Sequence, residues 1–270
     1  MNRQPAADRV HASQKAGRAK VCLIGAAGRM GRRCVRLLEG HPQLRLSAVW
    51  LRQGQAPLPL LEAVQSANFA DLAEHSDVFI DFTAPPACQH TLPPCAAAGR
   101  PYVLASTGLS PADEAAIAQA KGQLALLQAA NLSPAVAVLR DLVARAARAL
   151  PDYDVEICEI HHRHKRDAPS GTARLLAAAV QGTGERAHLV LGRNGAEPRR
   201  DGRQIGVAAL RGGEVVGEHT AYFFGEAERL EVSHRSSNPD LFAIGALRAA
   251  CFVLRQAPGH YDMQDMLAQA

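Results

Sequence analysis

Residues 20–31 read KVCLIGAAGRMG, and this stretch decides the fold of the first half of the chain. Its first five residues form a short apolar run, which is typical of a buried parallel strand. The glycines follow without a break, and residues 32–39 then carry a helical pattern that ends at Gly40. A strand, a glycine turn and a helix in this order predict an α/β domain that binds a nucleotide at the turn.

The three glycines of this turn have separate tasks in a dinucleotide-binding loop. Gly25 permits a tight turn, Gly28 lets the backbone approach the pyrophosphate, and Gly31 allows the helix to pack closely on the strand. The spacing G-x-x-G-x-x-G is a variant of the commonest fingerprint, so the glycines alone would also fit a structural turn. Because a strand and a helix flank them, we predict a Rossmann-like, parallel-sheet nucleotide domain.

The end of the second predicted strand, residues 44–51, bears on the choice of cofactor. A carboxylate at this point binds the ribose diol of NAD, whereas this chain has Leu51 followed by Arg52. A guanidinium there can pair with the 2′-phosphate of NADPH. We therefore expect NADPH as the favoured cofactor and NADH as the second option. The alternative is that Arg52 is only a solvated loop residue.

Three later strands of the first half end in small or polar residues. They are 77–83 with Asp81 and Thr83, 102–108 with Ser106 and Thr107, and 124–127, which is followed by Asn131. Ligands bind at the carboxyl ends of the strands in an open α/β sheet. Each residue alone is more often a turn or cap residue, but their shared edge favours a ligand site.

The second half of the chain changes character after a long apolar helix at residues 134–150. The elements predicted next are a strand at 153–160, a helix at 172–181, a loop at 182–204, strands at 205–211, 214–220 and 230–234, and a helix at 242–256. The turn on Gly212-Gly213 between two of these strands suggests antiparallel pairing, unlike the first half. We expect a second domain with a mixed sheet.

Residues 159–172, EIHHRHKRDAPSGT, concentrate groups that handle protons and anions. Three histidines and a lysine lie close together, and histidine changes its charge near neutral pH. The Ser-Gly-Thr triplet is typical of a helix start, whose free backbone N–H groups suit a carboxylate or a phosphate. We predict that a small anionic substrate is held and protonated here.

Plainer roles stay open for several of these residues. The His161-His162 pair lacks a third ligand at a suitable spacing, so we predict no metal site. His164 suits a solvated or packing role, and Lys165 could form a surface ion pair with Asp167 or Glu159.

Composition argues against several classes of protein. With 47% hydrophobic and 21% charged residues, the 270-residue chain fits a globular protein of one large or two modest domains. Its net charge is +4 and only 4% of its residues are aromatic, so a nucleic-acid partner is not indicated. Six scattered cysteines without a C-x-x-C pair indicate buried free thiols and a reducing compartment. Residues 1–19 read as a disordered basic leader without a secretory h-region, and no apolar run is long enough for a membrane, so we expect a cytoplasmic protein.

The stretch EIHHRHKRDAPSGTA, residues 159–173, resembles the signature of the 4-hydroxy-tetrahydrodipicolinate reductase family, also called dihydrodipicolinate reductase. It matches the pattern E-x-H-H-x-x-K-x-D-A-P-S-G-T-A throughout, and a motif of this length is highly specific. Further matches lie in the glycine loop, at residues 81–83, and at 217–220, 228–231 and 234–235. The resemblance covers nearly everything after the leader.

The resemblance implies a fold, a reaction and an assembly. It implies a nucleotide domain at 20–132, completed by 242–270, and a mixed α/β substrate domain at 133–241 whose open sheet builds a homotetramer. NAD(P)H would deliver hydride to C4 of a cyclic dicarboxylate, with loss of the hydroxyl as water, in the diaminopimelate route to lysine. The expected partner is this small molecule, without nucleic acid or membrane.

The resemblance also implies roles for the matching residues. His161 would be the acid/base group and Lys165 the proton donor. The substrate would be bound by His162, Ser170, Gly171 and Thr172. The cofactor would be contacted by Gly25, Ala26, Ala27, Gly28, Arg29, Met30, Arg52, Ala105, Ser106, Thr107, Ala129, Ala130, Asn131 and Leu132.

The chain departs from the family pattern mainly on the cofactor side. Leu51 stands where many members have an acid, Ala105 replaces a glycine, and Leu132 replaces a frequent aromatic. Ala135 lies where a glycine is common, and the usual Ser-Arg is missing near residues 238–239. The substrate motif is intact. This favours the reductase over two alternatives, a reductase of another cyclic imine acid and a noncatalytic dinucleotide-binding sensor.

Overall fold

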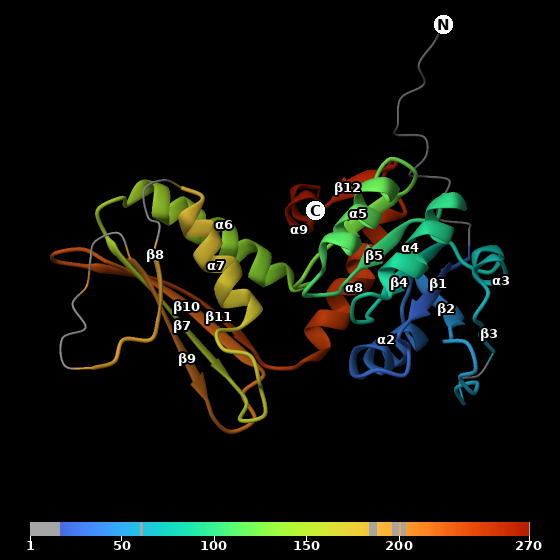
Figure 1. The fold of residues 1–270 in the computed structure, drawn as a ribbon, viewed down its shortest axis with the longest axis horizontal. Helices are drawn as coiled ribbons and strands as arrows, with labels where there is room; N and C mark the ends of the chain where they lie inside the picture. Colours follow the sequence, from blue (N-terminus) through green and yellow to red (C-terminus); the bar gives the residue numbers. More distant parts are fainter. Residues whose placement is uncertain (1–16, 60–61, 184–187, 196–199, 201–203, 270) are drawn as a thin grey trace, which may run out of the picture. The chain divides into compact units, whose positions relative to one another are not determined.

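The computed structural model describes residues 17–59, 62–183, 188–195, 200 and 204–269. These residues form two compact units (Figure 1). The first unit contains the described chain up to Ala129 together with Ala246–Tyr261, and the second contains Ala130–Gly245 and the chain from Asp262 onward. The predicted leader lies outside the described residues except for its last three, of which Ala19 begins the first strand.

The first unit is built on a seven-stranded sheet in which neighbouring strands are parallel. The strands, in sheet order, are β12 (Gly259–Tyr261), β6 (Ala125–Gln128), β5 (Tyr102–Leu104), β4 (Val78–Asp81), β1 (Ala19–Ile24), β2 (Leu44–Trp50) and β3 (Val64–Ser66). The predicted parallel sheet is confirmed. The edge strands β3 and β12 are only three residues long, too short for a periodic pattern to predict them.

Helices of the first unit pack on this sheet through apolar side chains. They are α2 (Arg29–Glu39), α3 (Phe69–Glu74), α4 (Cys88–Ala97), α5 (Pro111–Ala120) and the part of α8 (Asp240–Val253) that follows Ala246. Leu72 of α3, Leu92 of α4 and Ile117 of α5 lie in one buried cluster with Phe79 and Tyr102 of the strands. These three helices therefore share one face of the sheet.

The second unit is built on a mixed five-stranded sheet. In sheet order its strands are β11 (Arg229–Ser236), β10 (Gly217–Phe224), β7 (Asp154–His161), β9 (Gln204–Arg211) and β8 (His188–Leu191). Strand β7 pairs antiparallel with β10 and parallel with β9, while β10 pairs antiparallel with β11 and β8 parallel with β9. The predicted fold class, a Rossmann-like domain and a mixed-sheet α/β domain, is confirmed.

Helices α6 (Pro134–Ala149) and α7 (Gly171–Gln181) pack on one face of this second sheet, and the short helix α9 (Met263–Ala268) contacts α6. Val155 and Ile157 of β7 are buried in the same cluster as Val143 of α6 and Leu176 of α7. Side chains alternate along a strand, so the later odd-numbered residues of β7 point to the same covered face. Glu159 and His161 at the end of β7 therefore point to the face that α6 and α7 cover.

Two predictions for the second unit are wrong. The strands on either side of Gly212-Gly213 do not pair with each other, because β7 lies between β9 and β10. The glycine turn instead contacts the end of β7, both of whose edges are paired. The Gly212 N–H donates to the His161 carbonyl at 3.0 Å, and the Arg163 N–H donates to the Gly213 carbonyl at 3.2 Å. The expected loop at 182–204 contains β8, a short edge strand whose side chains are only partly buried.

Two further properties follow from the described residues. All six cysteines are free, and four of them, Cys22, Cys34, Cys88 and Cys95, are buried, so the predicted free thiols are confirmed. Among the described helices, none has the length and apolar character needed to cross a membrane.

Candidate active site

The glycine loop joins β1 to α2 in a conformation that glycine alone supports well. Gly25 has a φ of +85°, in the left-handed region, and its carbonyl accepts a hydrogen bond from the Gly28 N–H at 3.0 Å. A Cβ atom at position 31 would lie 2.5 Å from the Cα of Ala26 and would overlap the Gly25 carbonyl. Gly28 precedes α2 without a side-chain cap, so the first N–H groups of the helix are available to an anion.

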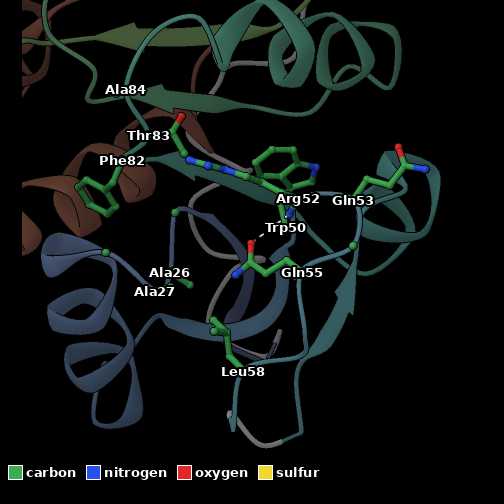
Figure 2. A pocket seen from close by; sticks show the side chains of 13 residues that line it. Ala26, Ala27, Trp50, Arg52, Gln53, Gln55, Leu58, Phe82, Thr83 and Ala84 are labelled. Atoms are coloured by element: carbon green, nitrogen blue, oxygen red, sulfur yellow. Dashed lines mark hydrogen bonds between the residues drawn. The ribbon is translucent and has the colours of Figure 1, made fainter.

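A cavity of about 640 Å³ opens beside this loop in the first unit. Its lining contains five of the predicted cofactor residues: Gly25, Ala26, Ala27, Gly28 and Arg52. Figure 2 shows the rest of its wall, which comes from the end of β2, the segment after it and the residues that follow β4. The other lining residues are Trp50, Gln53, Gly54, Gln55, Leu58, Phe82, Thr83 and Ala84, of which Thr83 belongs to the strand ends predicted to form a ligand site.

Arg52 belongs to a small turn at the rim of this cavity. Its backbone N–H donates to the side-chain oxygen of Gln55 at 3.2 Å, which Figure 2 shows as a dashed line. Its carbonyl accepts from the Gln55 N–H at 2.9 Å. Leu51 is buried, so the side chain that replaces the usual acid does not face solvent. The turn holds the backbone of an exposed guanidinium beside the cavity.

Asp81 points into the protein rather than into the cavity. Its buried carboxylate accepts hydrogen bonds from the Tyr102 hydroxyl at 2.6 Å and from the N–H and hydroxyl of Thr83 at 2.7 and 2.5 Å. The Thr83 carbonyl in turn accepts from the Ser106 hydroxyl at 2.5 Å. Asp81 therefore fixes Thr83 in the cavity wall, and Ser106 braces the same segment.

The remaining predicted cofactor residues lie outside the lining of this cavity. Arg29 and Met30 form the first turn of α2, Ala105–Thr107 follow β5, and Ala129 follows β6. Ala130–Leu132 belong to the second unit. There the side-chain amide of Asn131 donates to the Thr172 hydroxyl oxygen at 2.9 Å, so the structure brings this residue to the substrate motif. Leu132 is buried.

At the end of β7, Glu159 and His161 are buried on the face that the helices cover. The Glu159 carboxylate accepts hydrogen bonds from both terminal nitrogens of Arg211, at 2.9 and 2.8 Å, and from the Ser170 N–H at 3.0 Å. It also makes a short hydrogen bond with Nδ1 of His161. Neither Glu159 nor Arg211 was predicted as a site residue, although an acid that shares a buried strand face with a histidine needs a cation nearby.

Burial and neighbouring charges act on this pair in opposite senses. Burial would raise the pKa of Glu159, but hydrogen bonds from Arg211, His161 and Ser170 outweigh it and lower the pKa. Burial lowers the pKa of His161, and Glu159 offsets part of that shift. A neutral His161 beside an ionised Glu159 must carry its proton on Nδ1, which leaves the lone pair of Nε2 free to accept a proton.

The free nitrogen of His161 faces the start of β10. A Cβ atom at position 217 would lie 3.0 Å from Nε2, so glycine lets the backbone of β10 pack this close to the ring. His219, two residues further along β10, packs its ring edge to face against the ring of His161, with 5.1 Å between the ring centroids. Nε2 of His219 lies 3.0 Å from the Ser170 hydroxyl oxygen. Burial lowers the pKa of His219 to about 3, so this ring is neutral near neutral pH.

A metal is not indicated by this concentration of histidines. His161, His219 and His234 are near one another, but no group of three or more ligating side chains in the described part of the chain is placed to hold a metal ion.

The loop after β7 carries the predicted proton donor. The Lys165 ammonium forms an ion pair with Asp167 at 2.9 Å, and this contact lowers the pKa of Asp167. Asp167 is largely exposed, so the pair is weak and Lys165 can exchange this partner for another anion. His162 is half-buried, whereas His164 is exposed, which agrees with the predicted solvated role of His164.

Helix α7 presents its N-terminus within the same motif. Ser170 caps the helix, and its hydroxyl oxygen accepts a hydrogen bond from the Ala173 N–H at 3.2 Å. Among the described residues, none accepts a hydrogen bond from the N–H groups of Gly171 or Thr172. A Cβ at position 171 would meet nothing within 4 Å. The helix start therefore offers two free donors and open space to an anion.

Comparison with known proteins bears on both units. The family model "Dihydrodipicolinate reductase, N-terminus" matches residues 19–132, and the model "Dihydrodipicolinate reductase, C-terminus" matches residues 135–267. The chain belongs to the dihydrodipicolinate reductase family. The 4-hydroxy-tetrahydrodipicolinate reductase of Anaeromyxobacter dehalogenans (strain 2CP-C) is 44% identical over 263 residues, which cover 92% of this chain and 97% of the relative.

Solved structures share the fold. The dipicolinate-bound dihydrodipicolinate reductase from Paenisporosarcina sp. TG-14 matches with a TM-score of 0.76 and 21% identity, over 91% of this chain and 97% of that one. GenD2 from gentamicin A biosynthesis, in complex with NAD, matches with a TM-score of 0.60 and 14% identity, over 94% and 91%. The family predicted from the motif at residues 159–173 is thus confirmed, and the chain is an oxidoreductase of the reductase family with a nicotinamide cofactor.

Proposed function

We propose that this enzyme reduces 4-hydroxy-tetrahydrodipicolinate to tetrahydrodipicolinate with NAD(P)H, with loss of water, in the diaminopimelate route to lysine. Relatives that are named for this activity match the chain over almost their whole length. The observation that carries the proposal at the level of residues is the pairing of His161 with Glu159 beside the uncapped donors of α7. This arrangement supports a proton-accepting nitrogen and an anion site within one motif.

The first unit fits a dinucleotide. The cavity has the size of a cofactor site, the first turn of α2 has free N–H groups for a pyrophosphate, and position 31 tolerates no side chain. The loop from Gly25 to Met30 and the rim residue Arg52 would hold the cofactor. When bound, the reduced nicotinamide supplies the hydride.

The second unit fits a small dicarboxylate. One carboxylate would accept hydrogen bonds from the N–H groups of Gly171 and Thr172 and from the Thr172 hydroxyl, where the helix dipole favours negative charge. Asn131 already donates to the Thr172 oxygen, so the Thr172 O–H is left to point outward. His162, half-buried in the adjacent loop, would contact the substrate as well.

Proton transfer falls to His161 and Lys165. In the net reaction a hydride takes the place of the hydroxyl at C4, and one proton leaves with that hydroxyl as water. The ring of His161 can accept a proton at Nε2 and return it, because Glu159 holds Nδ1. Lys165 can donate a proton once a substrate carboxylate replaces Asp167 as its partner.

We also propose a preference for NADPH. The rim of the cavity carries the guanidinium of Arg52 and has the apolar Leu51 where a carboxylate would repel a 2′-phosphate. Trp50 at the end of β2 and Gln55 in the segment after it line the same wall, and Arg52 is the cation of that wall within the lining described.

The assembly we propose is a homotetramer built on the second sheet. The face away from α6 and α7 carries the apolar side chains of Ile160, Leu210, Tyr222 and Phe224, and Leu210 and Phe224 are 46% and 37% exposed. The rings of Tyr222 and Phe224 stack at 5.7 Å. A second copy of this chain would cover that surface. Light scattering after size exclusion measures the mass of the assembly and so tests the tetramer.

The compartment that we propose is the cytoplasm, because free cysteines are typical of proteins in a reducing compartment.

A coupled assay tests the activity. The preceding synthase makes the substrate from pyruvate and aspartate semialdehyde, and the absorbance of the reduced nicotinamide is followed with NADPH and with NADH. Turnover is expected with both and is expected to be faster with NADPH. A folded protein that binds nucleotide without turnover would overturn the proposal in favour of a sensor or of another cyclic imine acid as substrate.

A further inference from the structure

The most completely bonded carboxylate of the second unit lies behind His161. Glu159 has no exposed surface, and its two oxygens accept four hydrogen bonds: two from Arg211, one from the Ser170 N–H and one shared with Nδ1 of His161. No part of this carboxylate is left for a substrate. Its contacts instead all run to groups that form the proposed site.

We propose that Glu159 and Arg211 are a positioning pair that fixes on which nitrogen His161 carries its proton. The inference rests on the proposed acid/base role of His161. Glu159 contacts neither solvent nor open space, so it acts through the histidine ring and not on the substrate. With the proton held on Nδ1, Nε2 stays a proton acceptor beside Gly217, the position at which a Cβ would come within 3.0 Å of it.

Arg211 does more than neutralise this charge. It grips both oxygens of Glu159, and Nη2 also donates to the Asp167 carbonyl at 2.6 Å. Glu159 itself accepts from the Ser170 N–H at 3.0 Å. The pair therefore fixes the end of β7, the loop that carries Lys165 and the start of α7 relative to one another.

The charge state of Glu159 depends on Arg211. Burial alone would raise the pKa of the carboxyl, and a protonated Glu159 could donate to Nδ1 of His161. The proton of the neutral ring would then sit on Nε2, which is the reverse of what a proton acceptor requires. A bidentate arginine keeps the carboxylate ionised and excludes that arrangement.

The groups that face His161 come from every element around it. They are Glu159 on β7, Arg211 on β9, His219 on β10 and Lys165 in the loop. Of these, Glu159 raises the pKa of His161, whereas burial, Lys165 and Arg211 lower it. Removing the negative charge of Glu159 is therefore expected to lower the pKa of His161 further.

The test compares Glu159→Gln with a matched control on the same strand, Glu156→Gln. Glu156 also pairs with arginines, Arg193 and Arg200, but points to the opposite face of the sheet. Glu159→Gln is expected to lower kcat about 10- to 100-fold, part of the roughly 10²- to 10⁴-fold that a positioned acid–base group supplies. The KM for substrate and the Kd for NADPH should stay near wild type. The acidic limb of the kcat–pH profile should move to lower pH. Glu156→Gln should match the wild type in all four measurements.

A second variant, Arg211→Lys, keeps the charge but loses the two-pronged grip on Glu159. If Arg211 positions His161 through Glu159, kcat should fall in this variant too, while thermal melting shows that the fold is retained. The kcat of Arg211→Lys therefore tests the positioning role even where Glu159→Gln fails to fold. The inference is overturned when Arg211→Lys keeps wild-type kcat, or when Glu156→Gln loses as much kcat as Glu159→Gln. A third variant, His161→Gln, separates the acid/base role of His161 from the positioning role of Glu159 and Arg211. Wild-type turnover in His161→Gln refutes the acid/base role itself, whereas loss there with wild-type turnover in Glu159→Gln refutes only the positioning pair.

Discussion

The side-chain amide of Asn131 donates a hydrogen bond to the hydroxyl oxygen of Thr172 at 2.9 Å. The amide oxygen of Asn131 is occupied as well, because it accepts from the Ser133 N–H at 2.8 Å, which fixes the orientation of the amide. Thr172 lies in the first turn of α7, where a substrate carboxylate is proposed to bind. A donor behind the Thr172 oxygen leaves the Thr172 O–H as a donor toward that carboxylate.

Replacing Asn131 by Asp is expected to reverse this hydrogen bond. A carboxylate can only accept, so it would draw the Thr172 O–H away from the substrate and add a negative charge near the bound carboxylate. The KM for substrate should rise about 10-fold, in line with the loss of one hydrogen bond to a charged group. Thr172→Val, which lacks the hydroxyl, serves as the comparison and should raise the KM to a similar extent.

The same variant separates the two roles open to Asn131. Isothermal titration of NADPH into Asn131→Asp should give the wild-type Kd if the residue serves the substrate. A weaker Kd for NADPH with an unchanged KM for substrate would instead favour the cofactor contact that the family resemblance implies.

Gly31→Ala is expected to destabilise the first unit and to weaken nucleotide binding. The added methyl group would lie against the backbone of Ala26 and Gly25, neither of which can rotate away. Forcing atoms into a packed site costs about 1–3 kcal/mol, measurable by urea denaturation. Gly40→Ala at the other end of α2 is the control, because nothing lies within 4 Å of its new Cβ and its φ of −102° suits alanine. Equal stability of the two variants would contradict this account of the loop.

Arg52→Glu tests the choice of cofactor. The substitution exchanges a cation for an anion at the rim of the cavity, so the 2′-phosphate of NADPH would lose an ion pair and meet repulsion. The KM for NADPH should rise about 10- to 100-fold, the range expected for a hydrogen bond to a charged group. NADH lacks the phosphate and serves as the internal control, with a KM within about twofold of wild type. A parallel rise for both cofactors would mean that Arg52 shapes the cavity without reading the phosphate.

The parts of the site that could be predicted from the sequence are those that local chemistry builds. The glycine loop and the start of α7 depend on neighbours within one turn, and Gly25 and Ser170 lie where the pattern put them. Arg211 lies 52 residues after Glu159, and His219 lies 49 residues after Ser170. Nothing local indicates that these residues return to the motif, because their approach depends on the order of strands in the sheet.

The misplaced hairpin around Gly212-Gly213 has the same cause. A glycine turn between two strand patterns predicts a direct pair, but pairing is a competition among all strands of the sheet. Here β7, with its alternating buried residues, takes the central place between β9 and β10. That arrangement is what brings Arg211 from β9 and His219 from β10 to opposite sides of His161.

Stability should depend on pH through His219. Burial in the folded state lowers the pKa of this ring from 6.5 to about 3. As the pH falls below 6.5, the unfolded chain therefore binds a proton at His219 that the folded chain does not. The free energy of unfolding should decrease from pH 6.5 down to about pH 3, with a contribution from His219 of up to about 1.4 kcal/mol per pH unit.

His219→Gln should flatten this dependence without abolishing it. His161 and His234 also have lowered pKa values, because the ring of His161 is buried and that of His234 is partly buried, so they contribute in the same sense. Urea denaturation at a series of pH values measures the slope, and His164→Gln, which changes an exposed ring, is the control and should keep the wild-type slope. A wild-type slope in His219→Gln would show that folding does not lower the pKa of this histidine, and the burial that we hold responsible for the shift would then have no such effect.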